Sequence, residues 1–399
     1  GAACPACPTI WRALSVPLMG GSQSSTAGPP EAPAGAPRVA SARKEAAPLL
    51  PVQTERKRVL GLVAMSAIIW FNVSGGPSGS EQIVAAAGPI VGLGLMLFFV
   101  VFYSVPQALM TAELSTAFAD NGGYSLWVKA AFGDFWAVQE SLWSFASGVV
   151  DSALYPVLFF HVCQKLVRWA AGYGSGLEQT SCTISLFQGE RFGLLGHHNN
   201  PMLCTFSGDW MCAAEWGCKV LILFVFAAPN MVSTKLVGSY LVSLATFVIA
   251  PFLILLVWGS WQMRTDFLVL SPKKDADWLE LVGVLYWSTA GFDSASTIAG
   301  EVEAPERTLP RALGLSVVSV VVCTGLPLLV AAGNDRFWKC WEEGSINAVM
   351  AQLCGPWLGA WAVLSSAVGN GGMFSAEFLE DTHQLEGMAC VGLAPSIFR

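Results

Sequence analysis

Residues 59–82 read V-L-G-L-V-A-M-S-A-I-I-W-F-N-V-S-G-G-P-S-G-S-E-Q, and this stretch decides the fold class. Its first part, 59–73, is almost entirely apolar, and S-G-G-P-S-G at 74–79 then interrupts the run. A backbone polar group left unpaired in hydrocarbon costs several kcal/mol. The interruption therefore predicts either a kink that neighbouring helices repair or a span that is unwound around a ligand.

The composition of the 399 residues places this interrupted run in a membrane protein. Charged residues make up 12% of the chain, about half of the roughly 25% usual in soluble domains. Hydrophobic residues make up 54%, which excludes a disordered chain. The apolar runs are continuous rather than alternating, which excludes a transmembrane barrel, and no basic run suits nucleic acid. We therefore predict an all-α membrane protein.

About eight apolar runs are each near the roughly 20 residues that cross a bilayer. They cover residues 59–73, 88–112, 134–165, 217–232, 236–260, 279–299, 312–332 and 355–379. Residues 1–56 are rich in Ala, Pro, Ser and Gly, which predicts a disordered tail. The basic residues Arg56, Lys57 and Arg58 favour a cytoplasmic N-terminus. Residues 166–216 would then be an extracytoplasmic insertion.

The eleven cysteines give only weak evidence for a metal site. Disulfides are favoured among the cysteines in or beside the predicted outer loops, namely Cys182, Cys204, Cys212, Cys218 and Cys340. Cys4 and Cys7 form a single C-x-x-C, which is weak evidence for zinc. Neither H-E-x-x-H nor G-x-S-x-G occurs. We expect no metal, no cofactor and no enzymatic activity.

Two of the predicted spans are interrupted, the first at 74–79 and the sixth near Gly291, and they are five spans apart. Transporters built from inverted repeats place discontinuous helices at corresponding positions of their two halves. The N-terminus of a half-helix offers unpaired N–H groups to a carboxylate, and freed carbonyl groups suit an ammonium. The spacing therefore predicts a ligand site at the two breaks. At either break alone, a kink without function is the alternative.

Several motifs in the same order resemble the amino acid–polyamine–organocation transporters, most closely the polyamine and L-type amino acid uptake branch of plants and protists. After 74–82, they are S-V-P-Q-A-L-M-T-A-E-L at 104–114, N-G-G-Y at 121–124, S-G-V-V-D-S-A-L-Y-P-V-L at 147–158 and D-S-A-S-T-I-A-G-E-V-E-A-P-E-R-T-L-P-R at 293–311. Residues 369–388 resemble the family's eighth helix and the start of the cytoplasmic loop that follows it.

This resemblance implies the LeuT-type fold, in which spans 1–5 and 6–10 form inverted repeats. It places the first repeat at 57–260, part of the second repeat at 279–385 and the start of a cytoplasmic loop at 386–399. The chain would then be truncated after about eight helices, so we expect residues 1–399 not to transport on their own. The resemblance also implies proton-coupled uptake of an amino acid or a polyamine by alternating access, in the plasma membrane.

Two positions depart from the pattern of the polyamine members. The stretch before the acid of the sixth span is Ala290-Gly291-Phe292, where those members often carry Asn-Tyr-Trp. His161 stands where an Asp is common late in the third span. Both changes make a polycation a less favoured substrate relative to an ordinary amino acid. A non-transporting sensor, or an assembly partner that keeps the fold, is the alternative function.

Polar side chains form one stripe on the third predicted span. Glu140, Ser144, Ser147, Asp151 and Tyr155 lie within about 40° of one another at ~100° per residue. Such a stripe faces the bundle or water rather than lipid. We predict that Asp151 pairs with the ammonium of the solute, that Tyr155 covers it, and that Glu140 serves proton transfer or an inner gate. The alternative is a stripe that only joins helices by hydrogen bonds.

The acids outside this stripe have two interpretations each. Asp293 follows the sixth-span break and either binds the solute or a proton, or caps the second half-helix. Glu81 stands in the same relation to the first break, where capping is favoured. Glu377 is interpreted as the last acid inside the membrane, with a structural or coupling role. At the predicted cytoplasmic edge, an ion-pair gate or a solvated face is formed by Glu301, Glu303 and Arg307.

The predicted solute site combines the two breaks with the stripe. Its residues are Ser74, Gly75, Gly76, Pro77, Gly79, Ser147, Asp151, Tyr155, Ala290, Gly291, Phe292 and Asp293. Proton coupling or gating is assigned to a second set, which is Glu81, Glu140 and Glu377. The expected partners are the amine-bearing solute, a coupling proton and the lipid bilayer.

Overall fold

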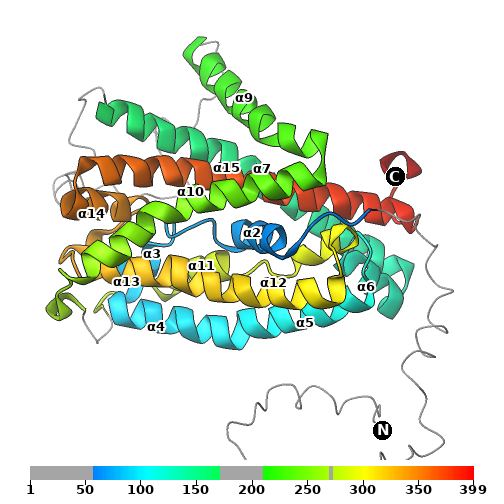
Figure 1. Cartoon of the computed structure of the whole chain (residues 1–399), viewed down its shortest axis with the longest axis horizontal. Helices are drawn as coiled ribbons and strands as arrows, with labels where there is room; N and C mark the ends of the chain where they lie inside the picture. The colour runs from blue at the N-terminus through cyan, green and yellow to red at the C-terminus, as the bar shows by residue number, and fades with distance from the viewer. Residues whose placement is uncertain (1–56, 171–209, 269–272) are drawn as a thin grey trace, which may run out of the picture. The chain divides into compact units, whose positions relative to one another are not determined.

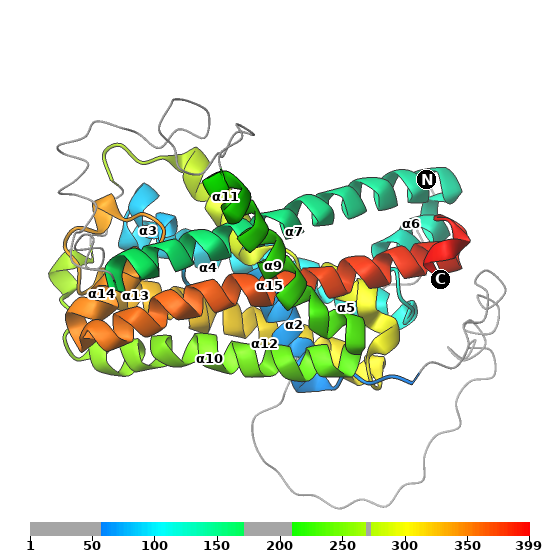
Figure 2. The same cartoon turned by 90° about the horizontal axis from the view of Figure 1, so that it is seen from above.

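The computed structural model describes residues 57–170, 210–268 and 273–399, and Figures 1 and 2 show them as an assembly of helices. The predicted tail and most of the predicted insertion lie outside the described residues. Five described stretches are long and apolar enough to cross a membrane: Pro89–Ala117, Asp134–Gln164, Ala213–Val232, Thr234–Ser260 and Pro305–Ala332. They confirm the second, third, fourth, fifth and seventh predicted spans. The chain is a multi-pass helical membrane protein.

The first and sixth predicted spans are each broken into two short helices. The first break lies between α2 (Leu62–Val73) and α3 (Gln82–Ala87), and the second lies between α11 (Trp278–Thr289) and the 3-10 helix η4 (Ser294–Glu301). Gly76 has φ 124° and Gly291 has φ 102°, which are conformations that glycine adopts without steric cost. The breaks are therefore where the glycines predict them. With 12 residues each, α2 and α11 are shorter than a membrane span.

The eighth predicted span is the helix α15 (Pro356–Cys390), which ends about three turns beyond the expected residue 379. It packs against α7 (Asp134–Ala170), α9 (Trp210–Val232), α10 (Thr234–Ser260) and α14 (Ser345–Cys354). Figures 1 and 2 both show α15 beside α7. Because protein covers it, α15 can carry glycines and acids that a lipid-facing helix could not. It is not among the five stretches recognised by length and hydropathy, so eight spans remain a prediction.

Two long helices share the same irregularity near their middle. The first consists of α4 (Pro89–Phe99), the π-helical turn η2 (Val100–Ser104) and α5 (Val105–Ala117). The second consists of α12 (Pro305–Val320), the π-helical turn η5 (Val321–Gly325) and α13 (Leu326–Ala332). Pro106 and Pro327 are each the second residue after the π turn. Because proline has no N–H to donate, the regular hydrogen bond fails there and the preceding turn widens.

The remaining helices are short connections. α6 (Tyr124–Phe132) comes directly before α7, just as α14 comes directly before α15. The other connections are the 3-10 turns η3 (Thr265–Phe267), η6 (Trp338–Cys340) and η7 (Ser396–Phe398). Among the described residues the β pairing is an isolated parallel bridge between Leu60 and Val302, which ties the start of α2 to the end of η4.

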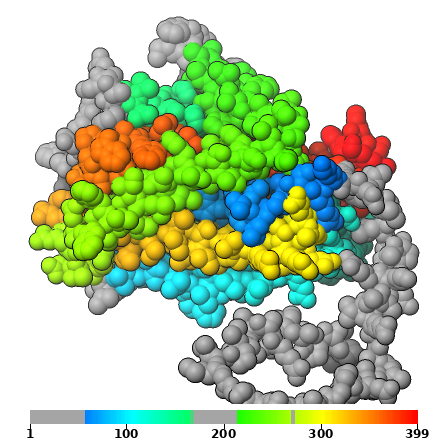
Figure 3. Space-filling view, viewed as in Figure 1, coloured from blue at the N-terminus to red at the C-terminus, as the bar shows by residue number. Residues whose placement is uncertain are grey.

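The buried core is built around α2, which is apolar on all sides. The helices α10 and α12 both pack against it, and α2 is visible between them in Figure 3. Phe71, near its end, is fully buried and lies against Gly372 of α15. A helix that is hydrophobic all round is expected in the interior of a large bundle. This packing holds the first break next to α15.

The cysteines that the structure describes agree in part with the disulfide prediction. Cys340 is disulfide-bonded. Cys218, at the edge of the predicted outer segment, is a free thiol. Cys218 lies on α9, away from any loop. Cys4, Cys7, Cys182 and Cys204, together with the side chain of Cys212, lie outside the described residues.

Candidate functional site

A cavity of about 480 Å³ lies between α7, α15 and the two helix breaks. Six carboxylates line it: Glu140, Asp151, Asp293, Glu377, Glu380 and Asp381. None of the described residues that line the cavity is Lys, Arg or His. Like charges in a space with limited access to water repel one another. The charge of this lining favours a cation over an anion.

The polar stripe of α7 faces this cavity along its whole length. All five predicted members, Glu140, Ser144, Ser147, Asp151 and Tyr155, line it. The stripe therefore faces the protein interior, as the 3.6-residue period predicts. The hydroxyl group of Tyr155 donates a hydrogen bond of 2.6 Å to Oε1 of Glu377, which joins α7 to α15.

The carboxylates of α15 include two that the sequence interpretation missed. Glu377 is not the last acid in the bundle, because Glu380 and Asp381 line the same cavity one turn later. Residues three and four positions apart lie on one helix face. Glu380 and Asp381 follow Glu377 at these spacings, so they are expected on the same face as Glu377. They were missed because the eighth span was expected to end at residue 379. Asp381 lies directly against Gly148 of α7.

The second break contributes three of its four predicted residues. Ala290, Gly291 and Asp293 line the cavity. Oδ1 of Asp293 accepts a hydrogen bond of 2.9 Å from Nε2 of Gln107 on α5. Phe292 does not line the cavity, because its side chain is fully buried in the hydrophobic core. The aromatic ring of Phe292 therefore packs the second break against the hydrophobic core and does not face the cavity.

The first break lies to one side of the cavity. Asn72 and Val73 at the end of α2 line it, whereas Ser74, Gly75, Gly76, Pro77 and Gly79 do not. The Ser74 hydroxyl is instead hydrogen-bonded to that of Thr324 in η5 at 2.7 Å. A methyl group on Gly291 would lie 3.3 Å from the carbonyl oxygen of Asn72, so the two breaks touch.

Glu81 has a structural position outside the cavity. Its side chain is fully buried, and it does not cap α3, the helix that it precedes. Oε2 accepts a hydrogen bond of 2.6 Å from the N–H of Gly79, and Oε1 accepts one of 2.9 Å from the N–H of Gly344. The capping interpretation is therefore corrected. The carboxylate satisfies freed N–H groups of the first break and of the turn before α14.

Several residues of the cavity were not predicted at all. They are mostly aromatic or amide side chains that reach it from α2, η2, α5, α6, α11, η4 and α15: Asn72, Tyr103, Gln107, Tyr124, Tyr286, Trp287, Ser294 and Met373. The sequence gives no periodic signal for them, because they come from seven different elements. His161, which replaces a family acid, does not line the cavity.

Carboxylate oxygens without partners are concentrated in this cavity. Oε2 of Glu140, Oε2 of Glu377 and Oε1 of Glu380 are buried, and none of them accepts a hydrogen bond from the described residues. Buried polar atoms are nearly always hydrogen-bonded in proteins. A buried carboxylate without a partner is costly, so these oxygens are free to accept hydrogen bonds from water or from a bound solute.

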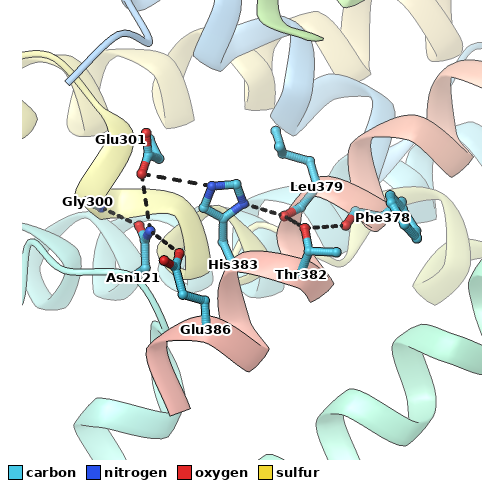
Figure 4. A network of polar contacts seen from close by, with 8 residues as sticks. All are labelled: Asn121, Gly300, Glu301, Phe378, Leu379, Thr382, His383 and Glu386. Atoms are coloured by element: carbon cyan, nitrogen blue, oxygen red, sulfur yellow. Dashed lines mark hydrogen bonds and ion pairs between the residues drawn. The ribbon is translucent and has the colours of Figure 1, made fainter. Parts of the chain in front are cut away.

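A second polar network joins η4, α15 and the turn before α6 (Figure 4). Nδ2 of Asn121 donates to Oε1 of Glu301 and to Oε2 of Glu386, both at 3.3 Å, and its Oδ1 accepts from the N–H of Gly300 at 3.0 Å. His383 lies 3.9 Å from Glu301. Of the predicted edge charges, Glu301 is buried in this Asn121 network, whereas Glu303 and Arg307 are exposed.

We expect Asn121→Asp to destabilise the protein at neutral pH. The replacement keeps an acceptor for Gly300 but places a third carboxylate between Glu301 and Glu386. Repulsion among the three carboxylates should lower the thermal midpoint below that of the wild type at pH 7.5. Thermal unfolding in detergent measures this, with Glu113→Gln at an exposed site as the control. A midpoint equal to that of the wild type would contradict the explanation.

The family of the chain is decided by comparison with known proteins. The family model described as "Amino acid permease" matches residues 60–395, a range that includes both breaks, the α7 stripe and α15. The chain belongs to the amino acid permease family. The resemblance inferred from the colinear motifs is therefore confirmed.

Two curated plant proteins are similar to this family member over most of its length. Polyamine transporter RMV1 of Arabidopsis thaliana is 33% identical over 349 residues, which are 87% of this chain and 63% of RMV1. Polyamine transporter PUT1 of Oryza sativa subsp. japonica is 33% identical over 344 residues, which are 86% of this chain and 57% of PUT1. This family member thus spans about three fifths of the length of these relatives. The printed names of both relatives describe polyamine transporters.

Proposed function

We propose that this protein is a secondary transporter whose substrate is a linear polyamine. A proton gradient drives the uptake of this substrate. The observation that supports it best is the cavity with six carboxylates and, among its described lining, no basic side chain. The relatives named polyamine transporters support the same substrate class. In this proposal the cavity is the central binding site.

The chemistry of the cavity favours a polyamine over an amino acid. Each ammonium group of a polyamine can donate charge-assisted hydrogen bonds to carboxylate oxygens that have no other partner. The carboxylate of an amino acid would instead meet like charges from α7, α15 and η4. This argument reverses the preference for an amino acid that Ala290-Gly291-Phe292 and His161 suggested.

We further propose that the helices form two inverted repeats. Each half has the same order of elements: a broken helix, a long helix with a π turn before a proline, a short helix and a long helix that lines the cavity. The breaks at 74–80 and 290–293 then occupy corresponding positions, as in transporters with inverted repeats. Alternating access would move one part of this arrangement against another around the cavity.

Proton coupling is proposed on the same carboxylates. Glu140 and Glu377 each have a buried oxygen without a hydrogen-bond partner among the described residues, so each can take a proton. A proton on one of these groups and an ammonium at another carboxylate of the cavity would then move in the same direction, which links uptake to the proton gradient. We also propose a cytoplasmic N-terminus, because Arg56, Lys57 and Arg58 precede α2, and a place in the plasma membrane.

Equilibrium binding tests the substrate class. We expect labelled spermidine to bind the purified protein in lipid nanodiscs, to be displaced by putrescine, to be displaced less well by arginine, and to be unaffected by leucine. Asp151→Asn should weaken binding about tenfold or more, since it removes a charge-assisted contact. Displacement by leucine, or no binding of any amine, would contradict the proposal.

Uptake by cells that express the complete gene product separates a transporter from a sensor. A proton-coupled transporter accumulates labelled spermidine faster at external pH 5.5 than at pH 7.5, and an uncoupler abolishes the difference. Binding without accumulation at either pH would instead favour a sensor that retains the fold.

A further inference from the structure

The six carboxylates are arranged as a track along α7. At one end Asp151, Glu377 and Asp381 lie close enough to interact electrostatically with one another, and we call them the Asp151 cluster. Tyr155 donates to Glu377 on the side of this cluster that lies farther along α7. Three carboxylates around one space provide a strong site for one ammonium group.

The other end of the track is formed by Glu140 and Asp293, which we call the Glu140 pair. These two carboxylates also interact electrostatically. A closed ring of hydrogen bonds lies beside them, in which Ser144 donates to Tyr124, Tyr124 donates to Gln384, and Gln384 donates to Ser144 at 2.8, 3.3 and 2.9 Å. The donors of these three side chains are thus already used, and Oε2 of Glu140 accepts no hydrogen bond from the described residues.

Glu380 lies between the two ends. It interacts electrostatically with Glu377 and Asp381 on one side and with Asp293 on the other. Its side chain is only 3% exposed, it lines the cavity, and its Oε1 accepts no hydrogen bond from the described residues. An unpaired acceptor that is so completely buried is rare, and its position indicates a donor in the middle of the ligand as well as at its ends.

The length of the track sets the length of the ligand. Glu140 and Asp151 are eleven residues apart on one helix, which is about 16 Å along its axis at ~1.5 Å per residue. With single bonds of about 1.5 Å, the terminal nitrogens of an extended chain are roughly 6 Å apart in putrescine, 11 Å in spermidine and 16 Å in spermine. Putrescine can therefore occupy one end of the track and spermidine roughly two thirds of it, whereas spermine matches its full length.

We infer that the cavity binds a polyamine of four nitrogens, such as spermine, in an extended form along α7. One terminal ammonium sits in the Asp151 cluster, an internal ammonium sits at Glu380, and the far end of the chain reaches the Glu140 pair. This inference rests on the proposed function and adds a preference for long polyamines over diamines. Glu140 and Glu380 are then specificity-determining residues, and Asp151 is an anchor for every amine.

The test compares three amines on two variants of the purified protein in nanodiscs. For Glu140→Gln we expect the affinity for spermine to fall about tenfold and that for putrescine to change less than about twofold. For Asp151→Asn we expect both affinities to fall about tenfold or more. For Glu140→Gln, the loss of affinity for spermidine is expected to lie between the losses for spermine and putrescine. Glu113→Gln, an exposed carboxylate outside the cavity, is the control for the loss of a charge.

The outcomes separate this inference from the proposed function. If no amine binds the wild type, the substrate class itself is wrong. If the amines bind but Glu140→Gln weakens spermine and putrescine by the same factor, or weakens neither, the extended binding mode is overturned. Thermal midpoints of the variants within about 2 °C of the wild type exclude a loss of fold as the cause, since 1 kcal/mol shifts a midpoint by several degrees.

Discussion

Ser147→Lys is expected to abolish polyamine binding while making the protein more stable. Ser147 lines the cavity, is exposed within it, and lies one turn before Asp151 on α7. A lysine at this position places a tethered ammonium among the carboxylates, where Asp151 at i+4 can pair with it. The lysine side chain would therefore occupy the position of the ligand. It would also reduce the repulsion among the carboxylates that line the empty cavity. Affinity for spermidine should fall at least a hundredfold.

The matched control is Ser147→Met, which has a similar length and no charge. We expect it to obstruct the cavity without supplying a cation, so that its binding falls less and its stability does not rise. Thermal unfolding with and without spermidine reads out both effects, because a ligand that binds the folded state raises the midpoint. A lysine variant that still shows this ligand-dependent rise, or one less stable than the methionine variant, would contradict the assignment of the cavity.

Gly92→Ala is expected to cause a large loss of stability at a position outside the cavity. Gly92 lies on α4, and a methyl group there would collide with the carbonyl oxygen of Ile83 and lie 2.8 Å from its carbonyl carbon. Both atoms belong to the backbone of α3, so no side chain can turn away. Overpacking of this kind costs typically 1–3 kcal/mol, and we expect a value at or above the upper end.

Gly94→Ala is the control, because it lies two residues later on the same helix and a methyl group there meets nothing within 4 Å. Alanine favours a helix over glycine by about 1 kcal/mol, so this variant should be at least as stable as the wild type. Fluorescence-detected size exclusion after heating compares the two. Equal midpoints for both variants would show that α3 and α4 are not in close contact.

The pattern of residues along single helices was enough to predict part of the site. The α7 stripe from Glu140 to Tyr155 follows one helical period, and all of its members line the cavity. The breaks follow from Gly76 and Gly291, because glycine adopts the positive φ angles of these positions without steric cost. Glu380 and Asp381 could have been found by the same reasoning, since they lie one turn after Glu377. The expected end of the span at residue 379 excluded them.

Other parts of the site depend on contacts between distant segments. Nothing local distinguishes Phe292, which is buried in the core, from Asp293, which lines the cavity and binds Gln107. In the same way Glu81 satisfies the N–H of Gly344, more than 200 residues away, and so has no oxygen directed to a solute. Sequence period places a residue on a face of its own helix, but it does not say which element covers that face.

The sequence alone was enough to predict an all-helical membrane protein with broken first and sixth spans and an acidic stripe on the third. These properties depend on composition, on glycine and proline, and on the helical period, which are all local. The family was inferred instead from several motifs that occur in the family's order. Only the tertiary structure decided that carboxylates from α7, α15 and η4 enclose one cavity, and that the first break lies beside it. The physical reason is that electrostatic repulsion and burial depend on distance in space, and packing between helices sets that distance.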